Sequence, residues 1–379
     1  MGDEPVIPLN RPFVSGGELT LVTEAVRSGR LGGDGPFTGR ATELLSKLTS
    51  VEDVLLTTSC THALELAAIL LEVGPGDEVL LPSFTFPSTA SAFVARGAMP
   101  VFVDIRPDTY NLDEQLLEAH VTSRTRAIVV VHYGGVGCEM DVIGEVAARH
   151  GVAVVEDAAH GLCGEYRGRP LGTFGAFATL SFHETKNVQC GEGGALLIDD
   201  AGFVERAVDL RDKGTDRARF ARGEVERYGW VDVGSSFLPS DLLAAFLCAQ
   251  LEAIDRIQAD RLATWDRYHA AFADLAERSG ILRPTVPAHC RQPAHLYGLL
   301  MPDVATRARF VSHLADRSIV SALHYTPLHS SAMGRRLAPD SHCPVSVEVS
   351  ERLVRLPLFA GMADHEVDRV IDAVLSFPG

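Results

Sequence analysis

From residue 53 to about residue 213 the chain alternates short apolar runs with amphipathic segments, and this alternation limits the fold more than any other feature. The apolar runs occupy residues 79–82, 101–105, 127–132, 153–156, 177–182 and 195–198, with helical patterns at 62–71, 113–120 and 140–150. Apolar strands that are separated by helices indicate a mainly parallel sheet covered on both faces. We therefore expect an α/β fold whose ligands bind at the carboxyl ends of the strands.

The pattern changes after Ser240, which we expect to be the N-cap of one long helical region over residues 241–278. Beyond it the sequence predicts a strand at 295–301, a helix at 306–317, a strand at 320–325 and a final helix from Asp364. This arrangement is typical of a smaller α+β domain. We place a large domain at residues 1–250 and a small C-terminal domain at 251–379.

Composition excludes several classes of protein. The formal charge of −16 argues against nucleic acid as a partner, because nucleic-acid binding needs a basic face. No apolar run reaches membrane-spanning length and no signal segment opens the chain, so we expect a cytoplasmic enzyme with no membrane partner. The seven scattered cysteines contain no CxxC pair, which indicates reduced thiols and no metal site.

The run SFHETKN at residues 181–187 places Lys186 shortly after a predicted strand, and the glycine-rich turn GEGG follows at 191–194. A lysine held at a strand edge can form a Schiff base, because an amine that is desolvated loses its proton more easily and attacks carbonyl groups. Most lysines are instead solvated surface residues. The interpretation of Lys186 therefore depends on its neighbours in the fold.

The run TTSCTHAL at residues 57–64 is a polar turn that opens a helix. Free backbone N–H groups and the helix dipole at such a terminus bind anions, and phosphate is the usual one. The alternative is simple N-capping by Ser59 or Thr61. No GxxxxGK[ST] loop is present, so a single phosphate is a better expectation than a triphosphate.

Two further residues follow predicted strands. Asp157 ends an apolar strand, where its carboxylate can hold a proton on a heteroaromatic nitrogen, although it can equally cap the following turn. Phe86 follows the strand at 79–82 and can stack on a flat ring, although such an aromatic residue is otherwise part of a core. A Schiff-base lysine, a phosphate turn, a ring-nitrogen carboxylate and a stacking aromatic together predict a pyridoxal phosphate site.

With these residues in place, the chain resembles the DegT-type nucleotide-sugar aminotransferases, a branch of the fold type I (aspartate aminotransferase-like) enzymes, over nearly its whole length. The resemblance rests on LGGDG at 31–35, GDEV at 76–79, PSFTF at 82–86, VEDAA at 155–159, SFHETK at 181–186, GEGG at 191–194 and LPLF at 356–359. The runs SFHETKN at 181–187, VHYGGV at 131–136 and HYTPLH at 324–329 are most similar to transaminases that make dTDP-4-amino-4,6-dideoxyhexoses from dTDP-4-keto-6-deoxyglucose.

This resemblance implies pyridoxal phosphate as cofactor, L-glutamate as amino donor and a homodimer with shared active sites. It implies that Lys186 forms the Schiff base, that Asp157 pairs with the pyridinium and that His160 contacts the 3-hydroxyl of the cofactor. It also implies a set of further contacts with the cofactor: stacking by Phe86, and phosphate binding by Cys60, Thr61 and Ser181.

One departure concerns the triplet Asn-Tyr-Arg that many relatives contribute from the neighbouring subunit. This chain has Ser236-Phe237-Leu238 there, so that Ser236 is at best a shorter substitute for the asparagine as a cofactor contact. We expect the substrate to meet His183, Lys213, His324, Tyr325 and His329. Lys213 can alternatively cap a helix, and His183 can alternatively pack against its surroundings.

Other functions share the scaffold. A sugar dehydratase would have histidine in place of Lys186, whereas an aromatic-amine-forming transaminase would keep the same cofactor residues. Transamination at C3 of the sugar and a non-catalytic regulator that retains the fold are further alternatives. The sequence does not distinguish gluco from galacto configuration in the product.

Overall fold

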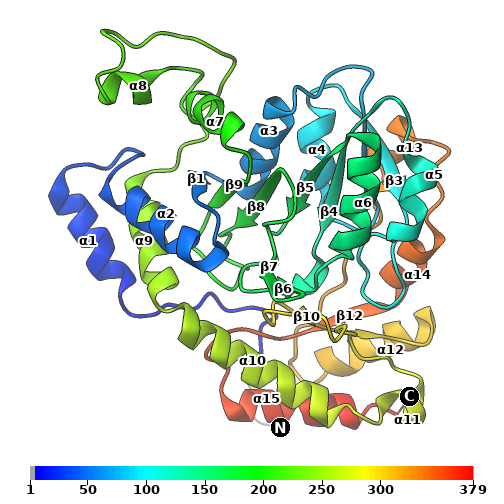
Figure 1. Ribbon diagram of the computed structural model, residues 1–379. Helices are drawn as coiled ribbons and strands as arrows, with labels where there is room; N and C mark the ends of the chain where they lie inside the picture. Colours follow the sequence, from blue (N-terminus) through cyan, green and yellow to red (C-terminus); the bar gives the residue numbers. More distant parts are fainter. Residues whose placement is uncertain (1–4, 379) are drawn as a thin grey trace.

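The computed structural model describes residues 5–378 and is built around a seven-stranded sheet with the order β1-β9-β8-β5-β4-β2-β3 (Figure 1). Its strands are β1 (Asp53–Thr57), β2 (Glu78–Pro82), β3 (Met99–Val103), β4 (Thr125–Val131), β5 (Ala153–Asp157), β8 (Phe177–Ser181) and β9 (Gly194–Ile198). Strand β9 runs antiparallel to both of its neighbours, and the other neighbouring pairs are parallel. The expected mainly parallel sheet is confirmed.

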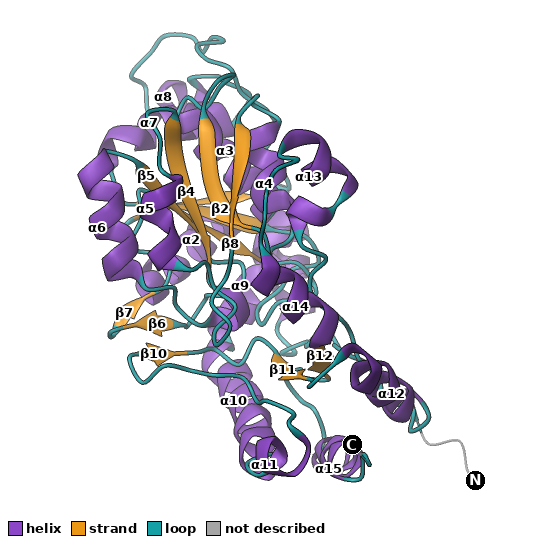
Figure 2. Ribbon diagram, turned by 90° about the vertical axis from the view of Figure 1, so that its right-hand side faces the viewer, coloured by secondary structure: helices purple, strands orange, loops and turns teal. Residues whose placement is uncertain are grey.

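Helices cover both faces of this sheet (Figure 2). One face packs against α3 (Cys60–Leu70), α4 (Pro87–Val94) and α7 (Val204–Arg211). The other face packs against α2 (Pro36–Thr49), α5 (Leu117–His120), α6 (Met140–His150) and α9 (Asp241–Glu252). Because successive side chains of a strand point to opposite faces, strands with apolar residues on both sides need this double cover.

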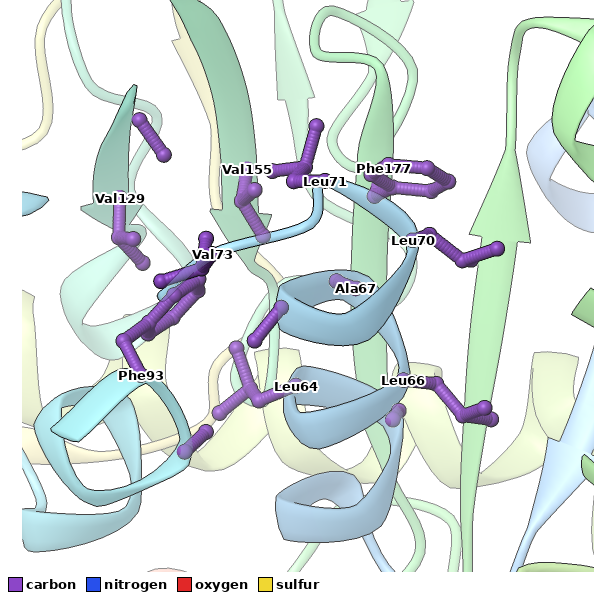
Figure 3. Close-up of a cluster of buried hydrophobic side chains, with 14 of the residues drawn as sticks. Leu64, Leu66, Ala67, Leu70, Leu71, Val73, Phe93, Val129, Val155 and Phe177 are labelled. Carbon is purple, nitrogen blue, oxygen red and sulfur yellow. The ribbon is translucent and has the colours of Figure 1, made fainter. Parts of the chain in front are cut away.

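Helix α3 lies in the larger of these cores (Figure 3). Its residues Leu64, Ala67 and Leu70 gather with Val155 and Phe177 from the sheet. A helix with apolar residues nearly all round its surface is stable only when it is buried on several sides. This packing fixes the N-terminus of α3 beside the carboxyl ends of β5 and β8.

The C-terminal part of the chain forms a separate core of mostly aromatic and aliphatic residues, which include Trp265, Tyr268, Tyr297, Phe310 and Val370. The elements of this core are α10 (Ile254–Ala271), α11 (Leu275–Ser279), β11 (Tyr297–Leu300), α12 (Val304–Ala315), β12 (Leu353–Leu356) and α15 (Asp364–Leu375). The same part of the chain contains α13 (Ala332–Leu337) and α14 (Pro344–Arg352), which contribute no side chain to this core. The remaining α-helices and strands are α1 (Glu18–Ser28), β6 (Glu165–Tyr166), β7 (Arg169–Pro170), α8 (Arg217–Ala221) and β10 (Cys290–Arg291). The domain boundary near residue 250 stays a prediction.

Two expectations differ from the structure. The long helical region 241–278 is divided into α9, α10 and α11, because α9 packs under the central sheet whereas α10 turns into the C-terminal core. The strand expected at 320–325 is wrong, since Ile319 bridges Ile7 and Ala322 bridges Arg355 as isolated pairs. The segment meets a different neighbour at each of these points and therefore builds no ladder.

Ser240 occupies the N-cap position of α9 as expected, but its hydroxyl accepts no capping bond. The side chain that orders this terminus is Asp241, whose carboxylate accepts hydrogen bonds from the backbone N–H groups of Phe37 and Thr38. The carboxylate therefore ties α9 to the start of α2.

Within residues 5–378, no helix is both long enough and apolar enough to cross a membrane. The same residues contain no group of three or more His, Cys, Asp and Glu side chains that could hold a metal ion, and all seven cysteines are free.

Candidate active site

A cavity of about 500 Å³ opens at the carboxyl edge of the central sheet. The ends of β4, β5 and β8 and the N-terminus of α3 contribute to its lining. It brings together ten residues that the sequence singled out: Cys60, Thr61, Phe86, Asp157, His160, Ser181, His183, Lys186, His324 and Tyr325. Their roles stay predictions, but their meeting in one cavity is a property of the fold.

Lys186 lies in the loop that follows β8. Its backbone N–H donates to the carbonyl oxygen of His183 at 2.9 Å, and the loop is closed by a bond from the N–H of Glu184 to the carbonyl of Gly191 at 2.9 Å. The pKa of the Lys186 amine is lowered to about 8: burial is the main cause and the charge of Arg355 adds to it, whereas Cys60 and Asp157 act in the opposite direction. The amine is therefore much easier to deprotonate than an ordinary lysine.

Asp157 ends β5 with its carboxylate buried. Its Oδ2 accepts a hydrogen bond from Oγ1 of Thr89 at 2.7 Å, and its Oδ1 accepts one from the N–H of Ala159 at 3.2 Å. Burial raises the pKa of this carboxyl, while the two hydrogen bonds oppose the rise. Asp157 therefore caps its turn through the bond from Ala159 and also lines the cavity, and its pairing with a ring nitrogen stays a prediction.

The preceding carboxylate, Glu156, has a structural role. It accepts hydrogen bonds from the backbone N–H groups of Gly172, Phe174 and Gly175 at 2.8, 2.6 and 2.8 Å. The Nδ1 of His132 accepts a hydrogen bond from the N–H of Cys138, so the ring proton is on Nε2. This Nε2–H donates to Oε2 of Glu156 at 2.9 Å. Adjacent carboxylates thus face opposite sides of β5, and only Asp157 lines the cavity.

The N-terminus of α3 has the features of an anion cradle. Ser59 is the N-cap, and its Oγ accepts from the N–H of His62 at 3.1 Å. Among the described residues, no group accepts from the backbone N–H of Cys60 or Thr61. A Cβ at Gly194 would lie 2.4 Å from the backbone nitrogen of Cys60, so glycine is what lets β9 approach this turn. Free N–H groups at a helix start suit a phosphate.

His160 is a neutral imidazole with a defined tautomer. Burial lowers its pKa well below the usual value, with Lys186, His324 and Arg355 contributing. The N–H of Gly134 donates to its Nδ1 at 3.3 Å, so the ring proton is on Nε2. The ring stacks on His295 with centroids 4.0 Å apart. His160 therefore has one N–H to offer an oxygen in the cavity.

Phe86 is 59% exposed although it follows a buried strand. It occupies the N-cap position of α4 and lines the cavity, so it is not a core residue. Phe84, two residues earlier, is 1% exposed and packs edge-on against Tyr110 and Tyr325. Phe86 thus has a ring available for stacking, whereas Phe84 belongs to the interior.

His183 and His324 both lie at the cavity, in different surroundings. His183 is at the edge, with Nδ1 2.9 Å from Oγ1 of Thr185 and Nε2 3.7 Å from Oε1 of Glu192, so it does not pack in a core. Burial lowers the pKa of His324 to about 2. Its ring stacks on Tyr325 with centroids 4.0 Å apart.

Three candidates lie outside the cavity of their own chain. Ser236 forms an isolated bridge with Asp212, and Nζ of Lys213 lies 2.6 Å from Oδ1 of Asp212. Nδ1 of His329 lies 2.5 Å from Oγ of Ser83. The structure therefore does not bring Ser236, Lys213 or His329 into the cavity that holds the ten other candidate residues.

The residues at the site that sequence reasoning missed include Thr89, His295 and Arg355. Thr89 orients Asp157, and the other two line the cavity from the C-terminal part of the chain. The one available signal was Arg355 itself, a charged residue inside the otherwise apolar run 353–358.

Comparisons with known proteins find relatives that match nearly the whole chain. SpsC, a spore coat polysaccharide biosynthesis protein of Bacillus subtilis (strain 168), is 34% identical over 377 residues, which cover 97% of this chain and 96% of that protein. The solved aminotransferase TlmJ from Streptoalloteichus hindustanus has a TM-score of 0.90 and 31% identity, covering 97% of this chain and 98% of its own. Spr1654 of Streptococcus pneumoniae, described as a candidate sugar aminotransferase and solved in its PMP form, has a TM-score of 0.90 and 29% identity, covering 98% of both chains.

These likenesses confirm the expected fold type I architecture. The model of the DegT/DnrJ/EryC1/StrS aminotransferases matches residues 14–375, and the chain therefore belongs to this family.

Proposed function

We propose that this protein is a pyridoxal phosphate-dependent nucleotide-sugar aminotransferase. In this proposal it converts dTDP-4-keto-6-deoxyglucose to a dTDP-4-amino-4,6-dideoxyhexose, with L-glutamate as amino donor. One observation carries the proposal. In a member of an aminotransferase family, a single cavity holds the amine of Lys186, the buried carboxylate of Asp157 and the free N–H groups that open α3.

Pyridoxal phosphate as the expected cofactor is confirmed by the family, whose solved neighbours include Spr1654 in PLP and PMP forms. The residues of this chain fit the group. The N–H groups of Cys60 and Thr61 with the hydroxyl of Ser181 would hold the phosphate, and the carboxylate of Asp157 would hold the ring nitrogen. When bound, pyridoxal phosphate supplies an aldehyde carbon that takes up the amino group and a ring that accepts electrons from the breaking C–H bond.

The side chains of this protein then bind, orient and move protons. Nζ of Lys186 would hold the aldehyde carbon and afterwards carry a proton as general acid and base, for which a pKa of about 8 is well placed. Asp157, oriented by Thr89, would keep a proton on the ring nitrogen. The Nε2–H of His160 would donate to the 3-oxygen, and the exposed ring of Phe86 would stack on the cofactor.

The sugar substrate is supported by resemblance and by the neighbours. The runs 131–136, 181–187 and 324–329 resemble transaminases that act on dTDP-4-keto-6-deoxyglucose. SpsC is named for polysaccharide biosynthesis, and Spr1654 is described as a candidate sugar aminotransferase. His183, His324 and Tyr325 line the cavity and would meet the sugar.

A homodimer with shared sites belongs to the same proposal. The segment around α8 projects from the body of the molecule (Figure 1). It exposes large apolar side chains, with Trp230 81%, Tyr228 55% and Val233 54% exposed. Surfaces of this kind mark protein–protein contacts. Since Lys213 and Ser236 flank this segment and lie outside their own cavity, we propose that they face the site of a second copy.

The decisive experiment is incubation with dTDP-4-keto-6-deoxyglucose, L-glutamate and pyridoxal phosphate, followed by NMR of the sugar product. The proposal expects an amine at C4, and the coupling constants give its configuration. Lys186→Ala should abolish multiple turnover and leave the fold intact. An amine at C3 would correct the position. Bleaching of the cofactor by L-glutamate without a sugar product would point to another acceptor, and no reaction with glutamate would favour a regulator.

A further inference from the structure

The turn at residues 293–295 brings His295 from the C-terminal part of the chain into the cavity, where its ring stacks on that of His160. The ring centroids lie 4.0 Å apart, with an angle of 23° between the ring planes. Burial lowers the pKa of both imidazoles well below the usual value, so both rings are uncharged at neutral pH. The stack is therefore a packing contact between neutral rings, and it limits the directions in which the His160 ring can turn.

His295 is itself held by Asn187, the residue that directly follows Lys186. Nδ1 of His295 lies 3.0 Å from Oδ1 of Asn187. The Nδ2 of Asn187 donates to the carbonyl oxygen of Pro293 at 2.7 Å and to Oε1 of Gln258 at 3.1 Å. Because these two acceptors fix Nδ2, Oδ1 of Asn187 is left to accept, and the ring proton of His295 is on Nδ1. Asn187 thus connects the loop of Lys186 to the imidazole of His295.

The backbone of the turn adopts a conformation that few residues other than glycine accept. Ala294 has a φ of 51° and is fully buried. Its N–H donates to Oε1 of Gln292. Arg261, on α10, donates to the carbonyl oxygens of Ala294 and His295 at 3.0 and 2.7 Å. Conformations of this kind persist only where the surroundings impose them, and they are concentrated at functional sites.

We propose that His295, tethered by Asn187, is a positioning residue for His160. The bond from the N–H of Gly134 to Nδ1 of His160 is long, at 3.3 Å, and alone leaves the imidazole free to tilt. The ring of His295 removes this freedom, because it covers one face of the imidazole. The inference rests on the proposed function, under which the Nε2–H of His160 donates to the 3-oxygen of the cofactor.

The first measurement uses the cofactor-free protein with ¹⁵N-labelled histidine. Long-range ¹H–¹⁵N NMR spectra distinguish the two neutral tautomers, and the signals that His160→Phe removes identify His160. We expect a proton on Nε2 alone in the unmodified protein. His295→Leu should give averaged signals of both tautomers, because the imidazole can then turn away from the N–H of Gly134. A single unchanged tautomer in His295→Leu would show that Gly134 alone positions the ring, and would overturn the inference.

The second measurement follows the absorbance of the protein loaded with pyridoxal phosphate as a function of pH. The midpoint reports the proton on the nitrogen of Lys186 once this nitrogen is joined to the cofactor. Loss of a donor leaves more negative charge on the 3-oxygen, which holds that proton more tightly. His295→Leu should therefore raise the midpoint by about half a unit to one unit. The other groups that shift the pKa of Lys186, namely Cys60, Asp157 and Arg355, are the same in every variant.

Two further variants separate the stacked ring from its tether. His295→Phe keeps a flat ring without the bond to Asn187, and Asn187→Ala removes the tether while leaving the ring. Each should raise the midpoint less than His295→Leu does. Circular dichroism and thermal melts check that each variant is folded. If His295→Leu does not fold, these two variants decide, and an unchanged midpoint in both would refute the positioning role.

The matched control is His269, whose ring stacks on Trp265 in the C-terminal core with centroids 4.5 Å apart. His269→Leu should leave the tautomer of His160 and the midpoint unchanged, even where it lowers the melting temperature. A shift in this control as large as that in His295→Leu would mean that both readouts follow a general loosening of the fold, which would also refute the inference.

A double variant tests whether His295 acts through His160. In protein that carries His160→Phe the donor to the 3-oxygen is absent, so the addition of His295→Leu should shift the midpoint no further. A further shift as large as that caused by His295→Leu alone would mean that His295 acts on the cofactor by another route. That result would exclude the positioning role.

The inference and the proposed function fail in distinguishable ways. If pyridoxal phosphate binds but is not joined to Lys186, the proposed function fails, while the tautomer of His160 in the cofactor-free protein still decides the positioning role. If transamination proceeds and His295→Leu leaves both the tautomer and the midpoint unchanged, the function stands and the positioning role is refuted.

Discussion

The acidity of Lys186 offers the sharpest quantitative test of the site. The pKa of this amine is lowered to about 8, chiefly by burial and in smaller part by the charge of Arg355. At pH 7 roughly one amine in ten is then uncharged, against roughly three in ten thousand for a lysine at the ordinary value of about 10.5. The nucleophilic form is therefore enriched about 300-fold at neutral pH.

Competitive labelling measures this pKa without the cofactor. Trace acetic anhydride is added to cofactor-free protein from pH 6 to pH 11, and the acetylated Lys186 peptide is quantified by mass spectrometry. Because only the uncharged amine reacts, the labelling rate follows deprotonation. We expect half of the maximal rate near pH 8.

The neighbours of Lys186 predict opposite shifts. Arg355→Gln removes a positive charge that lowers the pKa of Lys186, so its midpoint should move up. Asp157→Asn removes a negative charge that raises the pKa, so its midpoint should move down. Arg291→Gln, outside the cavity, should leave it in place. A midpoint near the ordinary value in the unmodified protein, or shifts of equal sign in the two cavity variants, would refute the electrostatic reasoning.

Lys186→Met should raise the stability of the cofactor-free protein at pH 7 by about 3 kcal/mol, because the unfolded state binds the lysine proton more tightly than the native state does. This native cost disappears as pH rises from about 8 toward 10.5, so urea titration at pH 7 and pH 10 checks the prediction, and a gain that does not shrink at pH 10 would contradict it. Glu156→Ala should lower the free energy of unfolding, measured in urea, by about 3–5 kcal/mol, because three backbone N–H groups lose their acceptor. Glu156→Gln should lower it clearly less, and equal losses in the two variants would mean that these bonds do not stabilise the loop. Phe86→Ala should weaken the binding of pyridoxal phosphate about 2–10-fold in fluorescence titration, with little change in melting temperature, whereas Phe84→Ala should destabilise the fold by about 3–5 kcal/mol. The reverse pattern would show that Phe86 is not part of the site.

Much of the seven-stranded sheet could be predicted from local patterns. The apolar runs that end at Pro82 and Ile198 coincide with β2 and β9, since a strand buried on both faces leaves a continuous apolar signal. The segment 320–325 has the same signal in weaker form. It builds no strand, because pairing depends on neighbours that are distant in the sequence.

The candidate site divides in the same way. The sequence by itself determined that Lys186 and Asp157 follow strands of one sheet, because the carboxyl ends of parallel strands meet at one edge. It also determined the helix start at Cys60, through polar residues placed ahead of an apolar helix.

Only the tertiary structure decided what the C-terminal part brings to that edge. Arg355 and His295 reach the cavity because their segments fold back onto the large sheet, whereas Lys213, Ser236 and His329 end elsewhere. Local order along the chain sets which strand end a residue occupies. Charge balance inside a cavity depends instead on side chains from distant segments, and no pattern within a single segment records it.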